Sequence, residues 1–254
     1  VVVNCAKQSE AVILCDLPSE IRNTILKFCY SQSIRVYVTP KLSDIIIRSA
    51  EDSHLIDSPL LLSRNNGFTF EQRFFKRAVD IVLTLALLFV FSPIMIVTAL
   101  AIKLYDRGPV LFLQERYTKG EQKFMIYKFR SMKINSDSIK YVPTMEDDPR
   151  VTPVGKVIRQ LRIDEMPQFF NILKGEMSLI GPRAESVKLT DAYVRDIPEF
   201  KYRLKVKSGL TGYAQVHGKY NTTPYDKLKL DLMYIQNYSW LMDMEIIFLT
   251  VKIL

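Results

Sequence analysis

Two adjacent carboxylates, Asp164 and Glu165, are the residues whose types and spacing point most directly to chemistry. They precede Pro167 and an apolar series at helical spacing that stops at Gly175, so we expect them just before the N-terminus of a short helix. The helix dipole favours negative charge and bound phosphate there. One ionised carboxylate could be a nucleophile while its neighbour holds a divalent cation. A plain N-terminal capping pair is the commoner explanation of two such residues on their own.

Cationic residues near the pair in sequence favour the chemical interpretation. Arg159 lies shortly before the pair, and Arg183 follows a Gly-Pro turn after an expected strand at Met177–Ile180. Guanidinium groups suit phosphate oxygens because they bind them in a bidentate manner. Lys128 and Arg130 fall on one face of another expected strand, although a basic strand alone is usually a solvated face.

A second basic series alternates with other residues at Lys201, Arg203, Lys205 and Lys207. The period of two predicts a strand. For this strand, a face turned to solvent or to lipid headgroups is favoured over a catalytic role.

The overall composition narrows the class of protein. A net charge of +8 and a pI of about 9.3 favour anionic partners, which include nucleic acid, an anionic membrane surface and phosphorylated substrates. Only two histidines are present, which argues against a histidine-rich metal cluster or a histidine-based triad. No basic recognition helix accompanies the charge, so no nucleic-acid partner is expected. The three cysteines lack CxxC spacing and indicate reduced core thiols facing the cytosol.

The N-terminal part alternates strands and helices. Apolar runs at Ala11–Leu17, Arg35–Thr39 and Leu60–Leu62 predict strands, and amphipathic patterns at Pro18–Cys29 and Leu42–Ile47 predict helices. This alternation indicates the later half of a doubly wound, Rossmann-like α/β domain. It contains no GxGxxG or P-loop motif, which favours a packing or regulatory role. The chain opens on valines without an initiating Met, as expected for a fragment.

A long apolar segment, Ile81–Ile102, carries no charged residue and has the length of a membrane helix. A spanning helix is the conventional interpretation. Pro93 lies near the midpoint, directly after Ser92, and removes a backbone donor, so we expect the helix to bend or break there. Each half then measures roughly 16 Å, about half of the ~30 Å hydrocarbon core.

The charges around this segment do not favour a crossing. Basic residues flank both of its ends: Arg73, Lys76 and Arg77 before it, and Lys103 and Arg107 after it. A positive-inside bias on both sides gives no preferred direction, so a re-entrant helix with both ends cytoplasmic is the competing interpretation.

Two amphipathic helices are expected at the C-terminal end, over Tyr225–Asn237 and Ser239–Leu254. Both are rich in leucine, methionine and aromatic residues. Core packing and an interfacial position on the membrane explain this composition equally well.

Ordered motifs give the sequence a specific resemblance to one family. The motifs are Lys76-Arg77-Ala78-Val79-Asp80, Ser92-Pro93, Gly108-Pro109, Lys128-Phe129-Arg130-Ser131-Met132, Ile163-Asp164-Glu165-Met166-Pro167-Gln168, Asn171-Ile172-Leu173-Lys174-Gly175-Glu176-Met177-Ser178, Gly181-Pro182-Arg183 and Gly209-Leu210-Thr211-Gly212-Tyr213-Ala214-Gln215-Val216. With them, the sequence from about Phe74 to the C-terminus resembles the bacterial sugar transferases, the monotopic polyisoprenyl-phosphate hexose-1-phosphate transferases that begin capsule, exopolysaccharide and O-antigen assembly.

The resemblance implies a reaction and the residues that perform it. Asp164 would attack a UDP-sugar, expel UMP and form a phosphosugar-aspartyl intermediate, from which undecaprenyl phosphate takes the phosphosugar. Glu165 would bind Mg²⁺, and Lys128, Arg159 and Arg183 would bind phosphate. Ser92-Pro93 would break a re-entrant helix in the bacterial inner membrane, with the enzyme on the cytoplasmic face. Both glucose and galactose phosphates remain open as the transferred group.

Two residues depart from the family pattern. Ala184 and Ser208 stand where many members have proline, and we expect both changes to loosen turns near the site. The reaction class is unaffected by them.

The expected architecture is α/β in three parts. Residues 1–66 form the partial Rossmann-like domain and its linker, 67–107 the linker and re-entrant membrane helix, and 108–254 a compact mixed α/β catalytic domain with interfacial amphipathic helices. A membrane-anchored regulatory or scaffold module, with lipid bound to its basic surface, is the main alternative to an enzyme. A homo-oligomer is left open.

Overall fold

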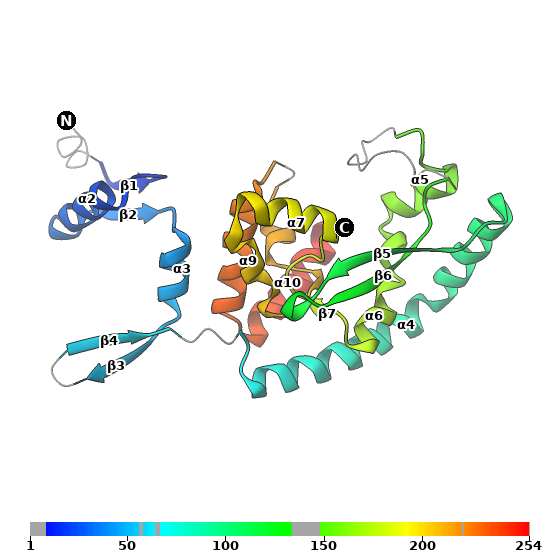
Figure 1. Ribbon diagram of the computed structural model, residues 1–254, viewed down its shortest axis with the longest axis horizontal. Coiled ribbons are helices and arrows are strands. Elements are labelled where there is room, and N and C mark those ends of the chain that lie inside the picture. Colours follow the sequence, from blue (N-terminus) through cyan, green and yellow to red (C-terminus); the bar gives the residue numbers. More distant parts are fainter. Residues whose placement is uncertain (1–8, 56–57, 64–66, 134–147, 220, 254) are drawn as a thin grey trace. The chain divides into compact units, whose positions relative to one another are not determined.

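The computed structural model describes residues 9–55, 58–63, 67–133, 148–219 and 221–253, and the chain divides into two compact units, Val1–Leu61 and Leu62–Leu254 (Figure 1). The expected boundaries at 66 and 107 stay a prediction. In the structure, the long helix after residue 67 is part of the second unit. The linker predicted around residues 64–66 lies outside the described residues.

The first unit contains the predicted βαβ alternation. β1 (Ala11–Leu14) and β2 (Arg35–Val38) pair in parallel, and α2 (Ser19–Ser31) connects them. The helix α3 (Leu42–Arg48) follows. β3 (Glu51–Leu55) and β4 (Ser58–Leu62) form a separate two-stranded sheet, of which the sequence indicated only the second strand. A larger Rossmann-like sheet therefore stays a prediction.

The second unit begins with α4 (Phe70–Asp106), a helix of 37 residues. Its start is fixed by a capping box: Thr69 Oγ1 accepts a hydrogen bond from the Gln72 amide, and the Gln72 side chain accepts one from the Thr69 amide. Arg107 ends it in the left-handed conformation, with φ of 57°. Within the described residues, α4 is the one helix long and apolar enough to cross a membrane.

Of the expected bend or break at Ser92-Pro93, the structure shows no break, because α4 continues through the proline as one curved ribbon (Figure 1). Proline has no amide hydrogen for the carbonyl group four residues earlier, here that of Phe89. Ser92 Oγ donates to this Phe89 oxygen at 3.0 Å instead. The serine thus satisfies the acceptor that Pro93 leaves free, which lets the helix continue in an apolar environment.

One face of α4 is buried at both ends of the helix but not in the middle. Its buried residues are Lys76, Asp80, Thr84, Met95, Thr98 and Ile102. Between Thr84 and Met95, this fully described helix has no buried residue. Large apolar side chains such as Phe89 and Val97 are exposed on the other faces. The helix therefore contacts its own unit at two places and presents the rest of its apolar surface outward.

Polar contacts fix the first turns of α4. Asp80 accepts hydrogen bonds from Ser178 Oγ at 3.1 Å and from the Leu179 amide at 3.0 Å. Arg77 donates to two carbonyl groups in the last turn of α6 (Gln168–Lys174), at 2.5 and 2.7 Å. Lys76 pairs with Asp243 at 2.7 Å. The basic and acidic residues that precede the apolar segment thus connect it to the folded unit.

The remainder of the unit combines small sheets with short helices. β5 (Leu111–Tyr117) and β6 (Lys123–Phe129) form an antiparallel hairpin around the 3-10 turn η1 (Lys119–Glu121), and β7 (Ser178–Ile180) pairs in parallel with β8 (Gly209–Thr211). The other elements are α5 (Pro153–Gln160), η3 (Ile163–Glu165), α7 (Val187–Asp196), η4 (Pro198–Lys205), α8 (Tyr213–His217), α9 (Pro224–Gln236) and α10 (Trp240–Ile253). The predicted strand near 178 and the two C-terminal helices are confirmed.

The strand predicted over 201–207 is wrong, because most of this stretch belongs to the 3-10 helix η4. Pro198 supplies the fixed backbone angle that suits the start of a helix. The buried residues Phe200, Arg203 and Leu204 follow helical spacing, and Arg203 pairs with the buried Asp231 at 2.7 Å. The charges repeat every second residue and so suggested a strand, whereas the buried residues repeat at helical spacing.

The two C-terminal helices differ in their surroundings. α9 buries one face that includes Leu228, Leu232 and Tyr234, so it is a core helix. In α10 only Ile246 is buried, while Trp240 is 68% exposed and Phe248 is 73% exposed. Only α10 has the exposed apolar surface that an interfacial helix needs.

Replacing Asp80 by alanine should destabilise the second unit. The change leaves two buried donors without an acceptor, which costs about 1–3 kcal/mol. For a unit of this size we expect a fall in melting temperature of roughly 2–4 °C for each kcal/mol. Thermal unfolding in detergent, compared with Glu71→Ala on an exposed position of the same helix, measures the effect. Equal melting temperatures for both variants would contradict the anchoring role.

Candidate active site

The two carboxylates lie on η3, a single 3-10 turn between α5 and α6. Arg162 precedes the turn with φ of 56°, an uncommon value for a residue with a side chain, and so redirects the chain after α5. Pro167 and Gly175 bound α6 as predicted, with φ of 85° at the glycine. Asp164 and Glu165, here called the dyad, are therefore held between two short helices, next to the N-terminus of the second.

Glu165 is neutralised by two cations. Its Oε1 accepts hydrogen bonds from Lys128 Nζ at 2.7 Å and from Arg183 Nη2 at 3.1 Å, and its side chain is only 14% exposed. Burial by itself would raise the pKa of this carboxyl group, but the charges of Arg183 and Lys128 outweigh it and hold the pKa at about 2. Glu165 is therefore ionised at any physiological pH.

Asp164 has different surroundings although it is the adjacent residue. Within the described part of the chain, no hydrogen bond or ion pair engages its carboxylate. Burial raises the pKa of Asp164, against the lowering effect of Lys128, and the neighbouring Glu165 charge adds to the rise. An unpaired carboxylate of raised basicity is suited to attack an electrophile.

Arg183 and Lys128 reach the site from two sheets. Lys128 lies on the inner face of the β5–β6 hairpin, and Arg183 follows β7 and bridges to Gly209 on β8. A Cβ atom added at Gly209 would lie 2.1 Å from the backbone nitrogen of Gly181. This close backbone approach requires glycine and sets where Arg183 leaves the sheet.

The remaining predicted cations divide between two roles. Arg159 acts on Asp164 through its charge, and its Nε donates to Ser131 Oγ at 2.8 Å. Arg130 lies outside the site, because it forms an ion pair with Asp106 at the end of α4. Neither Lys128 nor Arg130 is on a solvated face, since both are largely buried.

Two further polar residues, Arg116 and Gln168, line the small cavity beside Glu165 that Lys128 and Arg183 also line. Neither was among the predicted site residues. Arg116 on β5 shares the inner face of the hairpin with Lys128 on β6, so only the pairing of the two strands could have indicated it. Its Nη1 donates to the Ala184 carbonyl oxygen at 2.9 Å.

The two departures from the family pattern do not leave loose turns. Ala184 is buried, and the contact from Arg116 holds its carbonyl group. Ser208 is also buried, and its Oγ donates to the Tyr117 carbonyl oxygen at 2.9 Å. Each turn thus has a polar contact of its own, and the expected loosening relative to proline stays a prediction.

Comparison with known proteins shows the family. The family model described as bacterial sugar transferase matches residues 71–254. The chain belongs to the bacterial sugar transferase family. A relative from Aeromonas hydrophila, named UDP-N-acetylgalactosamine-undecaprenyl-phosphate N-acetylgalactosaminephosphotransferase, is 42% identical over 227 residues, which cover 88% of this chain and 53% of the relative. A UDP-glucose:undecaprenyl-phosphate glucose-1-phosphate transferase from Klebsiella pneumoniae is 41% identical over 78% of this chain and 42% of its own length.

The chain thus spans about half the length of these bacterial sugar transferases. The family match includes α4, the dyad and both C-terminal helices, whereas β1 to β4 precede it. Every residue of the site lies within the matched part.

The dyad carboxylates should affect stability in opposite directions. The pKa of Glu165 is lowered, so the stability that it contributes is present above its ordinary value of 4.5 and is lost as the pH falls through about 2. The pKa of Asp164 is raised, so its contribution is present below the ordinary value of 3.8 and is lost as the pH rises through the raised pKa. At about pH 7, Asp164→Asn should therefore raise the melting temperature and Glu165→Gln should lower it.

Melting curves of both variants at about pH 7 and about pH 3 check these signs. The gain from Asp164→Asn should disappear at the lower pH, where the parent carboxyl group is protonated. Shifts of the same sign for both variants at neutral pH would contradict the assignment.

Proposed function

We propose that this chain transfers a hexose-1-phosphate from a UDP-sugar to undecaprenyl phosphate, on the cytoplasmic face of the bacterial inner membrane. This would be the first membrane step of exopolysaccharide, capsule or O-antigen synthesis. The observation that carries the proposal is the contrast within the dyad, where Glu165 is held by two cations and Asp164 is left unpaired in a buried site. The names of the family relatives support the class of donor and acceptor.

The reaction proceeds in two displacements at the same phosphorus. A carboxylate oxygen of Asp164 attacks the phosphorus that carries the sugar, the bond from this phosphorus to the bridging oxygen breaks, and UMP leaves with the electron pair. A phosphate oxygen of the undecaprenyl acceptor then attacks the phosphosugar-aspartyl intermediate and releases the Asp164 carboxylate. The cationic groups of Lys128 and Arg183 lie where they can bind the phosphate oxygens.

The donor set near the dyad fits Mg²⁺. Both cationic contacts to Glu165 are to Oε1, so within the described residues Oε2 has no protein partner. No cluster of three or more possible metal ligands occurs among the described residues. Mg²⁺ is commonly held by one or two carboxylates together with substrate phosphates, which matches Glu165 and a bound pyrophosphate. When bound, it would screen the repulsion between carboxylate and pyrophosphate.

The contacts at the two ends of α4 support a re-entrant position. Lys76 and Asp80 near the start contact the folded unit, and Asp106 at the end contacts the same unit through Arg130. A helix that crosses a ~30 Å hydrocarbon core would carry its ends to opposite sides. Both ends of α4 therefore belong on one side, where Asp164 meets a water-soluble donor and a lipid phosphate.

Asp164→Asn should reduce turnover by about 10⁴-fold or more, because an amide cannot act as the nucleophile. Donor alone should release UMP from the parent and leave a phosphosugar mass on Asp164, and both signals should be absent in the variant. Mass spectrometry and UMP release with UDP-glucose, UDP-galactose and UDP-N-acetylgalactosamine measure this. Asp196→Asn, an exposed carboxylate of the same unit, is the control and should keep normal activity.

Two results would contradict this mechanism. Near-normal UMP release from Asp164→Asn would contradict the assignment of Asp164 as the nucleophile. Absence of UMP release by the parent with every donor would favour a membrane-anchored scaffold module over an enzyme. Glu165→Gln should lower the rate and weaken its dependence on Mg²⁺, so a normal rate at low Mg²⁺ would contradict the metal role.

Labelling should report both ends of α4 on the same side of the membrane. Phe70 and Tyr105, which are both exposed, are each replaced by cysteine in a variant without other cysteines. A thiol reagent is then added to one side or the other of sealed vesicles. The parent should show same-side labelling. Replacing Ser92-Pro93 by Leu-Ala restores the backbone donor that Pro93 lacks, so α4 should straighten and activity should fall. Opposite-side labelling of the parent would show that the segment spans.

A further inference from the structure

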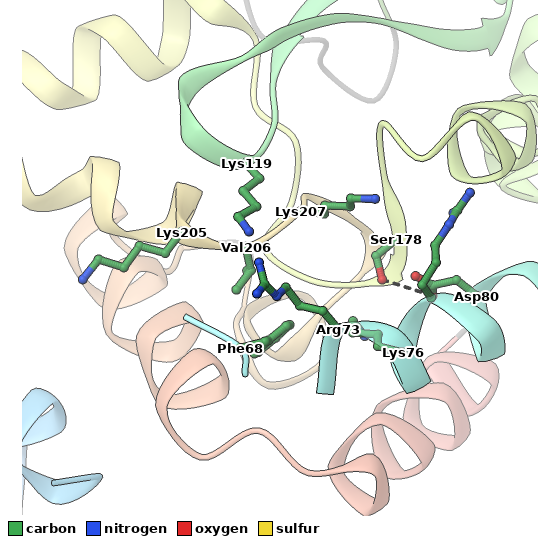
Figure 2. Close-up of a pocket in the computed structure, with 10 residues that line it drawn as sticks. Phe68, Arg73, Lys76, Asp80, Lys119, Ser178, Lys205, Val206 and Lys207 are labelled. Carbon is green, nitrogen blue, oxygen red and sulfur yellow. Dashed lines mark hydrogen bonds between the residues drawn. The ribbon is translucent and has the colours of Figure 1, made fainter. Parts of the chain in front are cut away.

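A second cavity, separate from the dyad, is lined mainly by cations (Figure 2). Its walls come from the start of α4, the η1 turn, the end of η4 with the residues that follow, and β7. Six of the ten lining residues are basic and one is acidic; the ten are Phe68, Arg73, Lys76, Arg77, Asp80, Lys119, Ser178, Lys205, Val206 and Lys207. The cavity shares no residue with the one beside Glu165.

Several of these charges have a partner. Lys76 pairs with Asp243, and Arg77 binds the terminal carbonyl groups of α6. Asp80 is engaged by Ser178 and by a backbone amide. These groups hold α4 in place and define the floor of the cavity.

Three cations remain without an anionic partner in the described part of the chain: Arg73, Lys119 and Lys207. Figure 2 shows Lys119 reaching from the hairpin turn toward Arg73 on α4. A Cβ atom at Gly175 would lie 3.5 Å from both Arg77 Nη2 and Lys207 Nζ, so these two charges also converge. Like charges brought together without an anion repel one another.

The surroundings of Lys207 agree with a missing anion. Burial lowers the pKa of this lysine, and the nearby charges of Arg77 and Lys119 lower it further, although Asp80 raises it without pairing with it. A bound phosphate would offset both effects, because an opposite charge favours the ionised lysine. Lysine and arginine together are the usual partners of phosphate oxygens.

The position of the cavity indicates where such a phosphate comes from. It opens at the first turns of α4, directly before the apolar segment. Phe70, Phe74 and Phe75 on these turns are 75%, 64% and 67% exposed. Exposed phenylalanines on the apolar face of an interfacial helix are buried at the boundary between the headgroups and the acyl chains. Phe68 and Val206 add apolar surface to the cavity wall, which suits a ligand attached to hydrocarbon.

We propose that this cavity binds the phosphodiester headgroup of an anionic phospholipid, with Arg73, Lys119 and Lys207 as its ligands. The bound lipid would fix the height of the folded unit on the membrane and hence that of Asp164. The proposal rests on membrane association and not on the transfer reaction.

Native mass spectrometry of the full chain in detergent tests the proposal, with short-chain phosphatidylglycerol as the probe. The parent should retain one lipid per chain. The double variant Arg73→Gln/Lys119→Gln should raise the dissociation constant by about tenfold or more, equivalent to at least roughly 1.4 kcal/mol. The matched control is Arg195→Gln/Lys219→Gln, which removes the same charge from exposed positions outside the cavity and should bind as the parent does.

Further measurements distinguish the possible sources of the bound phosphate group. They also separate the lipid-binding proposal from the proposed transfer reaction. Asp164→Asn should bind phosphatidylglycerol normally even where it is inactive. Equal lipid binding by the parent and the folded double variant, verified by its melting temperature, would overturn the site. Inorganic phosphate that displaces the lipid at equal concentration, or undecaprenyl phosphate that binds tenfold more tightly, would overturn its assignment to a phospholipid headgroup.

Discussion

The contact of Glu165 with Lys128 and Arg183 joins three parts of the chain that are distant in sequence. A buried carboxylate is tolerated only when its charge is compensated, and here the compensation comes from 37 residues before it and 18 residues after it. The hairpin, the η3 turn and the segment after β7 must all be in place for the three charges to meet. Removing the carboxylate leaves two like charges without their anion, and removing either cation leaves Glu165 with a single partner.

The same contact explains why the neighbouring carboxylate is free. In a 3-10 turn successive side chains point roughly 120° apart, so Asp164 forms no hydrogen bond with the partners of Glu165 and is affected only by their charge. Arg162, with its left-handed backbone, directs the turn and is itself a strained position. One short turn thus holds two adjacent carboxylates in different electrostatic surroundings. The charge of Glu165 is compensated by two cations, and the pKa of Asp164 is raised.

The sequence was sufficient to predict the dyad, its principal cations and most helices. Asp164, Glu165, Lys128 and Arg183 were recognised because their motifs are local, and the structure brings them together. Arg116 was missed because its role depends on the pairing of β5 with β6, which no local pattern states. The η4 helix was missed because its charges repeat every second residue while its buried residues follow helical spacing. At Pro93, the rule for proline held but the neighbouring Ser92 supplied the missing contact.

Several of the chain's cations have protein partners that fix the fold or the site. Lys76 and Arg77 fix the membrane helix to the folded unit, Lys128 and Arg183 compensate the dyad, and Arg203 pairs with Asp231 in the core. Each of these cations has a protein partner. Arg73, Lys119 and Lys207 have no anionic partner in the described part of the chain, and they are gathered at the start of α4, directly before the apolar segment. The two proposals, phosphate transfer at the dyad and lipid binding beside the apolar segment, therefore draw on different charges of the same unit.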